Sequence, residues 1–455
     1  MSNDTKIMRD AAERGIRYRE TIADRSVAPS PEAVAAVAAF DEALSEQGCD
    51  DTETLAMLDE IGSPASVAMA GPRFFGFVIG GSMPVTVAAN WLATAWDQNS
   101  VMSEVTPALA TMEDVSRRWL CELFGLPRDS AASFVTGATI ANFTALAAAR
   151  HRVLANAGWD VEKDGLIGAP ELTVIVGEEA HPTLTKSLGL LGLGRDKALR
   201  VPVDGQGRMI ADAVPAVDGP TIVCTQVGNI NTGASDPVAD ICSVVRPAGA
   251  WVHVDGAFGL WAAAVPAMRH LVAGLDAADS WATDAHKWLN VPYDSGVAIT
   301  RDAAALKAAM AITADYLPTG TNNRNPSDYT PELSRRARGV EIWAALRSLG
   351  RSGVEDLIVR CCAHATRFAG GLREAGYAIL NDVVLNQVLV SFGDDETTRR
   401  VIAEIQRDGT CWCGGTVWHG RRAMRISVCN WSTTEADVEA SLAAMLSCAE
   451  RVTRA

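Results

Sequence analysis

The chain contains 455 residues, of which 48% are hydrophobic and 21% are charged, so it can bury a large core and is long enough for two or three domains. Its 55 acidic residues outnumber its 40 basic residues and give a formal net charge of −15. This balance argues against binding to nucleic acid or to an anionic membrane surface, because both require basic patches that neutralise phosphate.

The N-terminal residues alternate in charge and no apolar signal-peptide stretch follows them, so we expect a cytoplasmic protein. Residues 74–96 carry no charge and are long enough to span a bilayer. Gly80-Gly81, Pro84 and Asn90 interrupt this stretch, which favours a buried loop followed by a helix. The ten cysteines have neither disulfide nor zinc spacing, so we interpret them as reduced, buried side chains and predict no metal site.

Two helices are expected near the start of the chain, one capped by Ser30 with Pro31 in its first turn and one beginning at Asp50-Asp51. Short apolar runs then alternate with helical patterns, which predicts an α/β domain with a mainly parallel, seven-stranded sheet flanked by helices. The predicted strands are 132–136, 172–176, 198–201, 221–226, 251–255, 280–283 and 296–299. Ligands in such domains bind beyond the carboxyl ends of the strands.

The pattern after Pro318 predicts a small α+β domain at the C-terminus. A capping box, Ser432-x-x-Glu435, is expected to open the final helix. The other predicted elements are helices 334–350, 353–376 and 396–407 and strands 385–392, 410–418 and 424–429.

Two opposite charges follow buried strands of the predicted sheet. The segment Asp284-Ala-His-Lys287 follows strand 280–283, and strand 251–255 ends in Asp255. A carboxylate at the end of a buried strand is costly unless it is paired. The two charges therefore form either a structural ion pair or the two ends of a site for an aromatic cofactor.

Pyridoxal phosphate requires such a set of groups. A lysine forms its Schiff base, a carboxylate pairs with its protonated pyridine nitrogen, and a glycine-containing turn at a helix N-terminus holds its phosphate. The turn Val135-Thr-Gly-Ala-Thr139, between a predicted strand and a predicted helix, supplies the third group.

These blocks resemble the pyridoxal-phosphate-dependent group II amino-acid decarboxylases, which include the glutamate, aromatic-amino-acid and cysteine-sulfinate decarboxylases. Thr136-Gly-Ala-Thr-Ile-Ala-Asn142 is similar to the family's phosphate loop, and Glu178-Glu-Ala-His181 to the block that carries its ring-stacking histidine. His253-Val-Asp-Gly-Ala-Phe258 is similar to His-Val-Asp-Ala-Ala-Tyr, and the lysine block to Asn/Asp-Pro-His-Lys.

The resemblance implies that Lys287 forms the Schiff base, Asp255 pairs with the pyridine nitrogen and His181 stacks on the ring. The other cofactor-binding residues that it implies are Gly137, Ala138, Thr139, Gln226, Asp284 and His286. Gly256 stands where the family usually has alanine, so we expect one face of the cofactor to lose a methyl contact.

The resemblance also suggests substrate contacts. Arg425 matches an arginine that grips the substrate carboxylate, although a structural ion pair is the alternative. Phe77 stands where glutamate decarboxylases have a polar residue, which indicates an apolar or aromatic substrate pocket unless Phe77 packs in the core. Tyr329 resembles the tyrosine that returns a proton to the substrate carbon, with Tyr316 as a competitor. The segment Ser334–Arg338 resembles Gly-Arg-Arg-Phe-Arg and is interpreted as an anchor of the following helix, with a catalytic role as the alternative.

The fold that the resemblance implies is fold type I, as in aspartate aminotransferase, in a homodimer with active sites at the subunit interface. We divide the chain into an N-terminal helical and dimerisation segment (1–75), a large cofactor domain (76–320), and a catalytic loop, connecting helix and small domain (321–455). The predicted reaction is α-decarboxylation of an L-amino acid to an amine and carbon dioxide. Decarboxylative oxidative deamination to an aldehyde, carbon–carbon bond cleavage, and cofactor binding without turnover are the alternatives.

Overall fold

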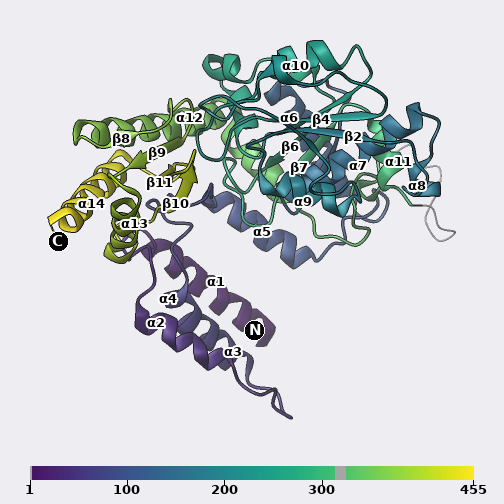
Figure 1. The fold of residues 1–455 in the computed structure, drawn as a ribbon. Coiled ribbons are helices and arrows are strands. Elements are labelled where there is room, and N and C mark those ends of the chain that lie inside the picture. The colour runs from purple at the N-terminus through teal and green to yellow at the C-terminus, as the bar shows by residue number, and fades with distance from the viewer. Residues whose placement is uncertain (1–2, 313–323, 455) are drawn as a thin grey trace. The chain divides into compact units, whose positions relative to one another are not determined.

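The computed structural model describes residues 3–312 and 324–454, which form two units (Figure 1). The larger unit comprises Gly80–Thr366 and Asn381–Val388. The smaller unit comprises Met1–Ile79, Arg367–Leu380 and Leu389–Ala455, so it combines the predicted N-terminal segment with most of the predicted small domain.

The larger unit contains a seven-stranded sheet with the strand order β1-β7-β6-β5-β4-β2-β3. All seven predicted strands are present, and the mainly parallel α/β fold is confirmed. Only β7 runs antiparallel to its neighbours, β1 and β6. The strands are β1 (Ala131–Val135), β2 (Thr173–Gly177), β3 (Leu199–Val201), β4 (Thr221–Gln226), β5 (Trp251–Asp255), β6 (Ser280–Asp284) and β7 (Gly296–Thr300).

Helix α7 (Ala138–Asn156) packs across β5, β6 and β7 and contacts α9 and α11 (Figure 1). Fully buried alanines, including Ala141, Ala145 and Ala148, allow the helix to approach the sheet closely. The other α-helices that lie wholly within this unit are α5 (Pro84–Trp96), α6 (Pro107–Phe124), α8 (Val161–Asp164), α9 (Pro182–Leu190), α10 (Val238–Val245) and α11 (Ala303–Met310). The close packing of α7 fixes the position of its N-terminus at the sheet edge.

The uncharged stretch at residues 74–96 contains a loop and helix α5, as predicted. Among residues 3–312 and 324–454, no helix is long and apolar enough to cross a membrane.

Helix α12 (Gly339–Glu374) is interrupted at Gly350, where φ is 61° and ψ is −172°. This break coincides with the predicted end of the first helix, but that helix begins at Gly339 and the predicted start at Ser334 was wrong. The backbone N–H of Arg335 donates to the Asn99 side chain, and its carbonyl accepts from the N–H of Ser100. These bonds hold Arg335 outside the helix.

The anchoring role predicted for the arginine segment is confirmed. The Arg335 side chain is fully buried, and its Nη2 lies 2.6 and 2.7 Å from the two carboxylate oxygens of Glu113 on α6. Arg336 pairs with Glu341, and Arg338 pairs with Asp294.

We expect Glu113→Ala to lower the free energy of unfolding by about 3–5 kcal/mol, because it leaves the buried Arg335 charge unpaired. Urea unfolding measures this change. Glu122→Ala, on the same helix, is the matched control: Glu122 pairs with Arg351, and both side chains are more than half exposed. This control should lose less than about 1 kcal/mol, and equal losses in the two variants would contradict the prediction.

The smaller unit contains the antiparallel sheet β10-β11-β9-β8 and the first and last helices of the chain. Its elements are α1 (Asn3–Thr21), α2 (Pro31–Ala36), α3 (Asp51–Met57), α4 (Ser63–Ala65), β8 (Ala378–Ile379), β9 (Gln387–Ser391), α13 (Asp395–Asp408), β10 (Gly414–Trp418), β11 (Arg421–Ser427) and α14 (Glu435–Arg454). Nine of the ten cysteines are buried, Cys49 is exposed, and all ten are free.

The predicted cap of the first short helix is confirmed, because Ser30 accepts the N–H of Ala33. The second helix begins at Asp51, as predicted, and Asp50 caps it by accepting the N–H of Thr52. The predicted capping box at Ser432 was wrong. Thr434 and Asp437 form the reciprocal bonds instead, because the Ser432 hydroxyl and backbone N–H bond to Asn430.

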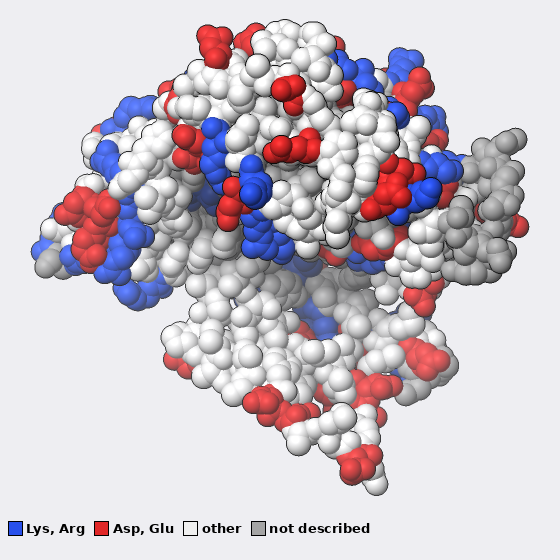
Figure 2. Space-filling model, turned by 45° about the vertical axis from the view of Figure 1, so that its right-hand side comes forward, with Lys and Arg blue, Asp and Glu red and all other residues white. Residues whose placement is uncertain are grey.

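Figure 2 shows acidic and basic side chains interspersed in small groups over the upper part of the view, whereas mainly acidic side chains are seen in its lower part. Many of the exposed charges form local pairs within a helix, such as Arg399 with Glu396 and Arg454 with Glu450. The net negative charge of the chain is therefore compatible with general surface solvation.

Candidate active site

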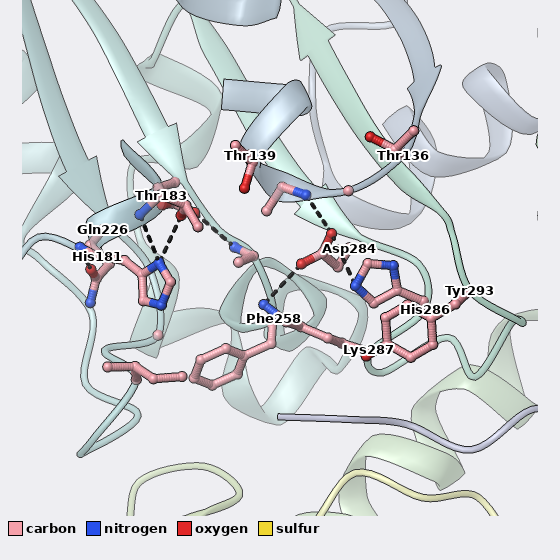
Figure 3. Close-up of a pocket in the computed structure, with 16 residues that line it drawn as sticks. Thr136, Thr139, His181, Thr183, Gln226, Phe258, Asp284, His286, Lys287 and Tyr293 are labelled. Carbon is pink, nitrogen blue, oxygen red and sulfur yellow. Dashed lines mark hydrogen bonds and ion pairs between the residues drawn. The ribbon is translucent and has the colours of Figure 1, made fainter. Parts of the chain in front are cut away.

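A cavity of about 360 Å³ lies in the larger unit at the carboxyl ends of β1, β4, β5 and β6 (Figure 3). It brings together every predicted cofactor-binding residue, namely Gly137, Ala138, Thr139, His181, Gln226, Asp255, Asp284, His286 and Lys287.

The turn before α7 passes close to the segment that carries the lysine. A Cβ atom on Gly137 would lie 3.1 Å from His286 Cε1 and 3.3 Å from Asp284 Oδ1. A Cβ atom on Gly296 would lie 2.5 Å from the Gly137 Cα atom. Glycine is therefore required at position 296, and a larger residue at 137 would narrow the cavity.

The N-terminus of α7 already attracts an anionic group. The backbone N–H of Ala138 donates to Asp284 Oδ1 over 2.5 Å. The N–H groups of a helix's first turn and the helix dipole make such a position suitable for phosphate.

Lys287 extends into the cavity, where its Nζ lies 2.9 Å from Asp284 Oδ2 (Figure 3). The Asp284 side chain is 3% exposed, and His286 Nε2 lies 3.5 Å from its Oδ1. Burial is the main cause of a lowered pKa at His286, although the Asp284 charge opposes this effect. The three residues form a compact charged group beside the helix N-terminus.

Asp255 lies on the cavity wall at the end of β5 and is 3% exposed. Its Oδ2 accepts from Asn142 Nδ2 over 3.1 Å, and its Oδ1 accepts from the N–H of Ala257 over 3.2 Å. Burial raises the pKa of Asp255, whereas the charges of His181 and Lys287 and the bond from Asn142 lower it. A cationic ring nitrogen would stabilise its ionised form further.

His181 is the N-cap of α9, and its ring is held in place by two contacts with Thr183. His181 Nδ1 lies 2.7 Å from Thr183 Oγ1 and accepts the N–H of Thr183 over 3.3 Å. Its own backbone N–H donates to Gln226 Oε1 over 3.1 Å (Figure 3). The cap therefore presents an imidazole of fixed orientation to the cavity.

Ala257, rather than position 256, supplies a methyl group to the cavity wall. A Cβ atom on Gly256 would lie 2.8 Å from the Leu260 Cβ atom and 3.4 Å from the carbonyl oxygen of Ala282. The expected loss of a methyl contact at Gly256 was therefore wrong, because a side chain there points into packed protein.

We expect Gly256→Ala to lower the free energy of unfolding by about 1–3 kcal/mol through overpacking against Leu260. Gly205→Ala is the control, because a Cβ atom on Gly205 meets nothing within 4 Å. Chemical denaturation of both proteins checks the prediction, and an undiminished stability of Gly256→Ala would contradict it.

Tyr293 also lines the cavity and was not predicted; its ring stacks on His286 with centroids 4.2 Å apart and planes inclined by 26°. Tyr293 lies on the loop that joins β6 to β7. Both ends of this loop lie at the edge of the sheet that carries Lys287. The position of Tyr293 between the two predicted strands could therefore have indicated that it lies near the cavity. Thr136, Thr183, Gly228, Ile230 and Phe258 also line the cavity.

Tyr329 is not among the described residues that line the cavity. It ends the 3₁₀ turn Pro326–Tyr329, and the guanidinium of Arg324 lies 4.2 Å from its ring centroid. The competing residue, Tyr316, lies outside the described residues. The identity of the proton-donating tyrosine stays a prediction.

Arg425 and Phe77, the predicted substrate contacts, belong to the smaller unit. Arg425 lies on β11, where burial lowers its pKa to about 10. Phe77 is 56% exposed and stacks on Trp412 with ring centroids 5.8 Å apart, so it is not a core residue of that unit.

Residues 43–393 match the model of the pyridoxal-dependent decarboxylase conserved domain. The chain belongs to this family. The decarboxylase is 25% identical to tryptophan decarboxylase 1 of Oryza sativa subsp. japonica over 80% of its own length and 78% of that protein. It is 27% identical to the acidic amino acid decarboxylase GADL1 of Bos taurus over 66% of its own length and 59% of that protein.

The fold of the decarboxylase matches a crystal structure described as Oryza sativa TDC with PLP and tryptamine. The TM-score is 0.90 and the sequence identity 22%, and the match covers 99% of both chains. The enzyme is therefore a pyridoxal-phosphate-dependent amino-acid decarboxylase with the predicted fold.

The residues of the cavity suit this cofactor. A helix N-terminus for the phosphate, a lysine for the carbonyl carbon and a buried carboxylate for the ring nitrogen converge on one space.

Proposed function

We propose that this decarboxylase removes the α-carboxylate of an L-amino acid with an apolar or aromatic side chain, releasing carbon dioxide and the amine. The observation that carries the proposal is the convergence of Lys287, Asp255 and the N-terminus of α7 on one cavity. Bound pyridoxal phosphate supplies an electron sink for the bond that breaks at the substrate Cα.

Each group has a separate task in this proposal. The N-terminus of α7 holds the phosphate, and Lys287 Nζ is the covalent anchor and a proton carrier near Cα. The Asp255 carboxylate holds the proton of the ring nitrogen, and the His181 ring covers one face of the cofactor. Arg425 orients the substrate carboxylate, and Tyr329 or Tyr316 returns a proton to Cα.

The preference for apolar substrates rests on Phe77. Its exposed ring offers dispersion and stacking contacts but no hydrogen bond to a distal carboxylate, which would lose solvation beside it. The named relatives act on different side chains, tryptophan in rice and acidic amino acids in cattle, so the family alone does not decide the substrate.

We also propose a homodimer. Large apolar side chains are exposed on α5 and on α2 with the turn that follows it, and such surfaces are typical of subunit interfaces. They include Val34, Val37, Trp91, Leu92 and Trp96, which are 40–54% exposed.

The test is an amino-acid panel incubated with the purified, cofactor-loaded enzyme. We expect carbon dioxide and amine in equal amounts, and a kcat/KM for aromatic or branched apolar substrates at least about 100-fold above that for glutamate. Formation of an aldehyde and hydrogen peroxide would show that the enzyme catalyses decarboxylative oxidative deamination instead of the proposed reaction. Preference for an acidic substrate would refute the assignment of Phe77, and absence of turnover with bound cofactor would favour a non-catalytic role.

A further inference from the structure

A chain of buried polar side chains runs from Asp255 into the protein interior. Asn142 on α7, His253 on β5 and Ser280 on β6 are each 0% exposed, and Trp251 on β5 is 5% exposed. Buried polar groups of this kind are costly unless each is hydrogen-bonded. Here every neighbouring pair is bonded, so the chain forms a satisfied network that ends at the cavity.

The distances define an unbroken path. Trp251 Nε1 donates to Ser280 Oγ over 2.8 Å, and Ser280 Oγ lies 2.9 Å from His253 Nδ1. His253 Nε2 lies 2.9 Å from Asn142 Oδ1, and Asn142 Nδ2 donates to Asp255 Oδ2 over 3.1 Å.

Only one set of donor directions satisfies this path. Complete burial lowers the pKa of His253 to about 3, so the ring is neutral and only one of its nitrogens carries a proton. If Nδ1 carried it, Nε2 would require the amide N–H₂ of Asn142, and Asn142 Oδ1 would then face the Asp255 carboxylate. Two acceptors facing each other repel, so the proton belongs on Nε2 and Ser280 donates to Nδ1.

We propose that Trp251, Ser280, His253 and Asn142 form a relay that positions Asp255 toward the cofactor ring nitrogen. The relay orients the Asn142 amide so that it donates to one carboxylate oxygen, while the N–H of Ala257 donates to the other. Asp255 is thereby held by both oxygens and kept from turning out of the cavity. This inference rests on the proposed pairing of Asp255 with the cofactor.

The relay is tested first with Asn142→Leu, which keeps the size of the side chain but removes the donor to Asp255. We expect a loss of about tenfold or more in affinity for pyridoxal phosphate, since a hydrogen bond to a charged group is removed. We also expect altered visible circular dichroism of the bound cofactor and a fall in kcat that exceeds any change in KM.

Thr144→Val is the matched control. Thr144 lies on the same helix and is equally buried, but its hydroxyl donates to the Ile140 carbonyl outside the relay. This variant should retain cofactor affinity and circular dichroism within about twofold, because its lost bond is an intrahelical one.

A pair of substitutions at His253 tests the link between position 253 and Asn142 without touching Asp255 or Asn142. Glutamine places an amide where Nε2 meets Asn142, whereas asparagine places one where Nδ1 meets Ser280. His253→Gln should therefore retain most of the cofactor affinity, and His253→Asn should lose about as much as Asn142→Leu. This comparison also decides the matter if Asn142→Leu does not fold.

Wild-type affinity and circular dichroism in Asn142→Leu, or equal impairment in the two His253 variants, would overturn the relay. Asp255→Asn separates the two proposals. If that variant binds the cofactor like the wild type, the role of Asp255 has failed. If it is impaired while folded Asn142→Leu is not, only the relay has failed.

Discussion

A Lys287→Ala enzyme is expected to lose the visible absorbance of lysine-bound cofactor and to decarboxylate its substrate at least about 10³-fold more slowly than the wild type. Lys287 lies at the edge of the sheet, 2.9 Å from Asp284 and beside the turn proposed to bind phosphate, so the substitution removes both the proposed covalent anchor and a proposed proton carrier. Absorbance spectra and measured release of carbon dioxide check the two effects separately.

Lys307→Ala is the control for the loss of a lysine. Lys307 lies on α11 and pairs with Asp328, and its side chain is 55% exposed. This variant should keep the cofactor absorbance and the rate of the wild type. A Lys287→Ala protein that also kept both would show that the cofactor is anchored elsewhere.

Asp255→Asn is expected to reduce kcat by about 10²- to 10³-fold while the protein remains folded. The substitution keeps the shape of the side chain but removes the charge that stabilises a proton on the cofactor ring. Steady-state kinetics with saturating cofactor measures this effect, and the cofactor spectrum reports the altered ring.

The control for Asp255→Asn is Asp279→Asn, which also removes a buried carboxylate from the sheet. Asp279 accepts from the N–H of Val252 and from Arg246 and does not line the cavity. We expect it to lower the thermal midpoint without a comparable effect on kcat. Equal kinetic losses in both variants would mean that Asp255 acts only through stability.

The sequence was informative about the sheet because each strand is a short, uniformly apolar run. Such a run shows that both faces of the strand are buried, but it does not indicate whether the strand runs parallel or antiparallel to its neighbours. The antiparallel course of β7 was therefore not visible. The start of α12 was not predictable from the local pattern either. Arg335 is held outside the helix by hydrogen bonds to residues 99 and 100, which are far from it in the sequence.

The residues of the cavity were largely predictable because they follow strands directly, where the carboxyl ends of the sheet meet. Side-chain direction at these ends was not predictable: whether position 256 or 257 faces the cavity depends on the turn after Asp255. The capping box was missed because Ser432-x-x-Glu435 and Thr434-x-x-Asp437 are both present, and only the contact of Ser432 with Asn430 decides between them.

The place of β7 in the sheet has a consequence for how the enzyme is made. β1 leads to the turn proposed to bind phosphate and β6 leads to Lys287, but β7, the last of the seven strands to be synthesised, lies between them. Residues 131–135 cannot find their partner until residues 296–300 have left the ribosome. Such long-range pairing slows folding, so a nascent chain must keep its first apolar strand from aggregating, and the cofactor has a complete site only after the last strand has been inserted.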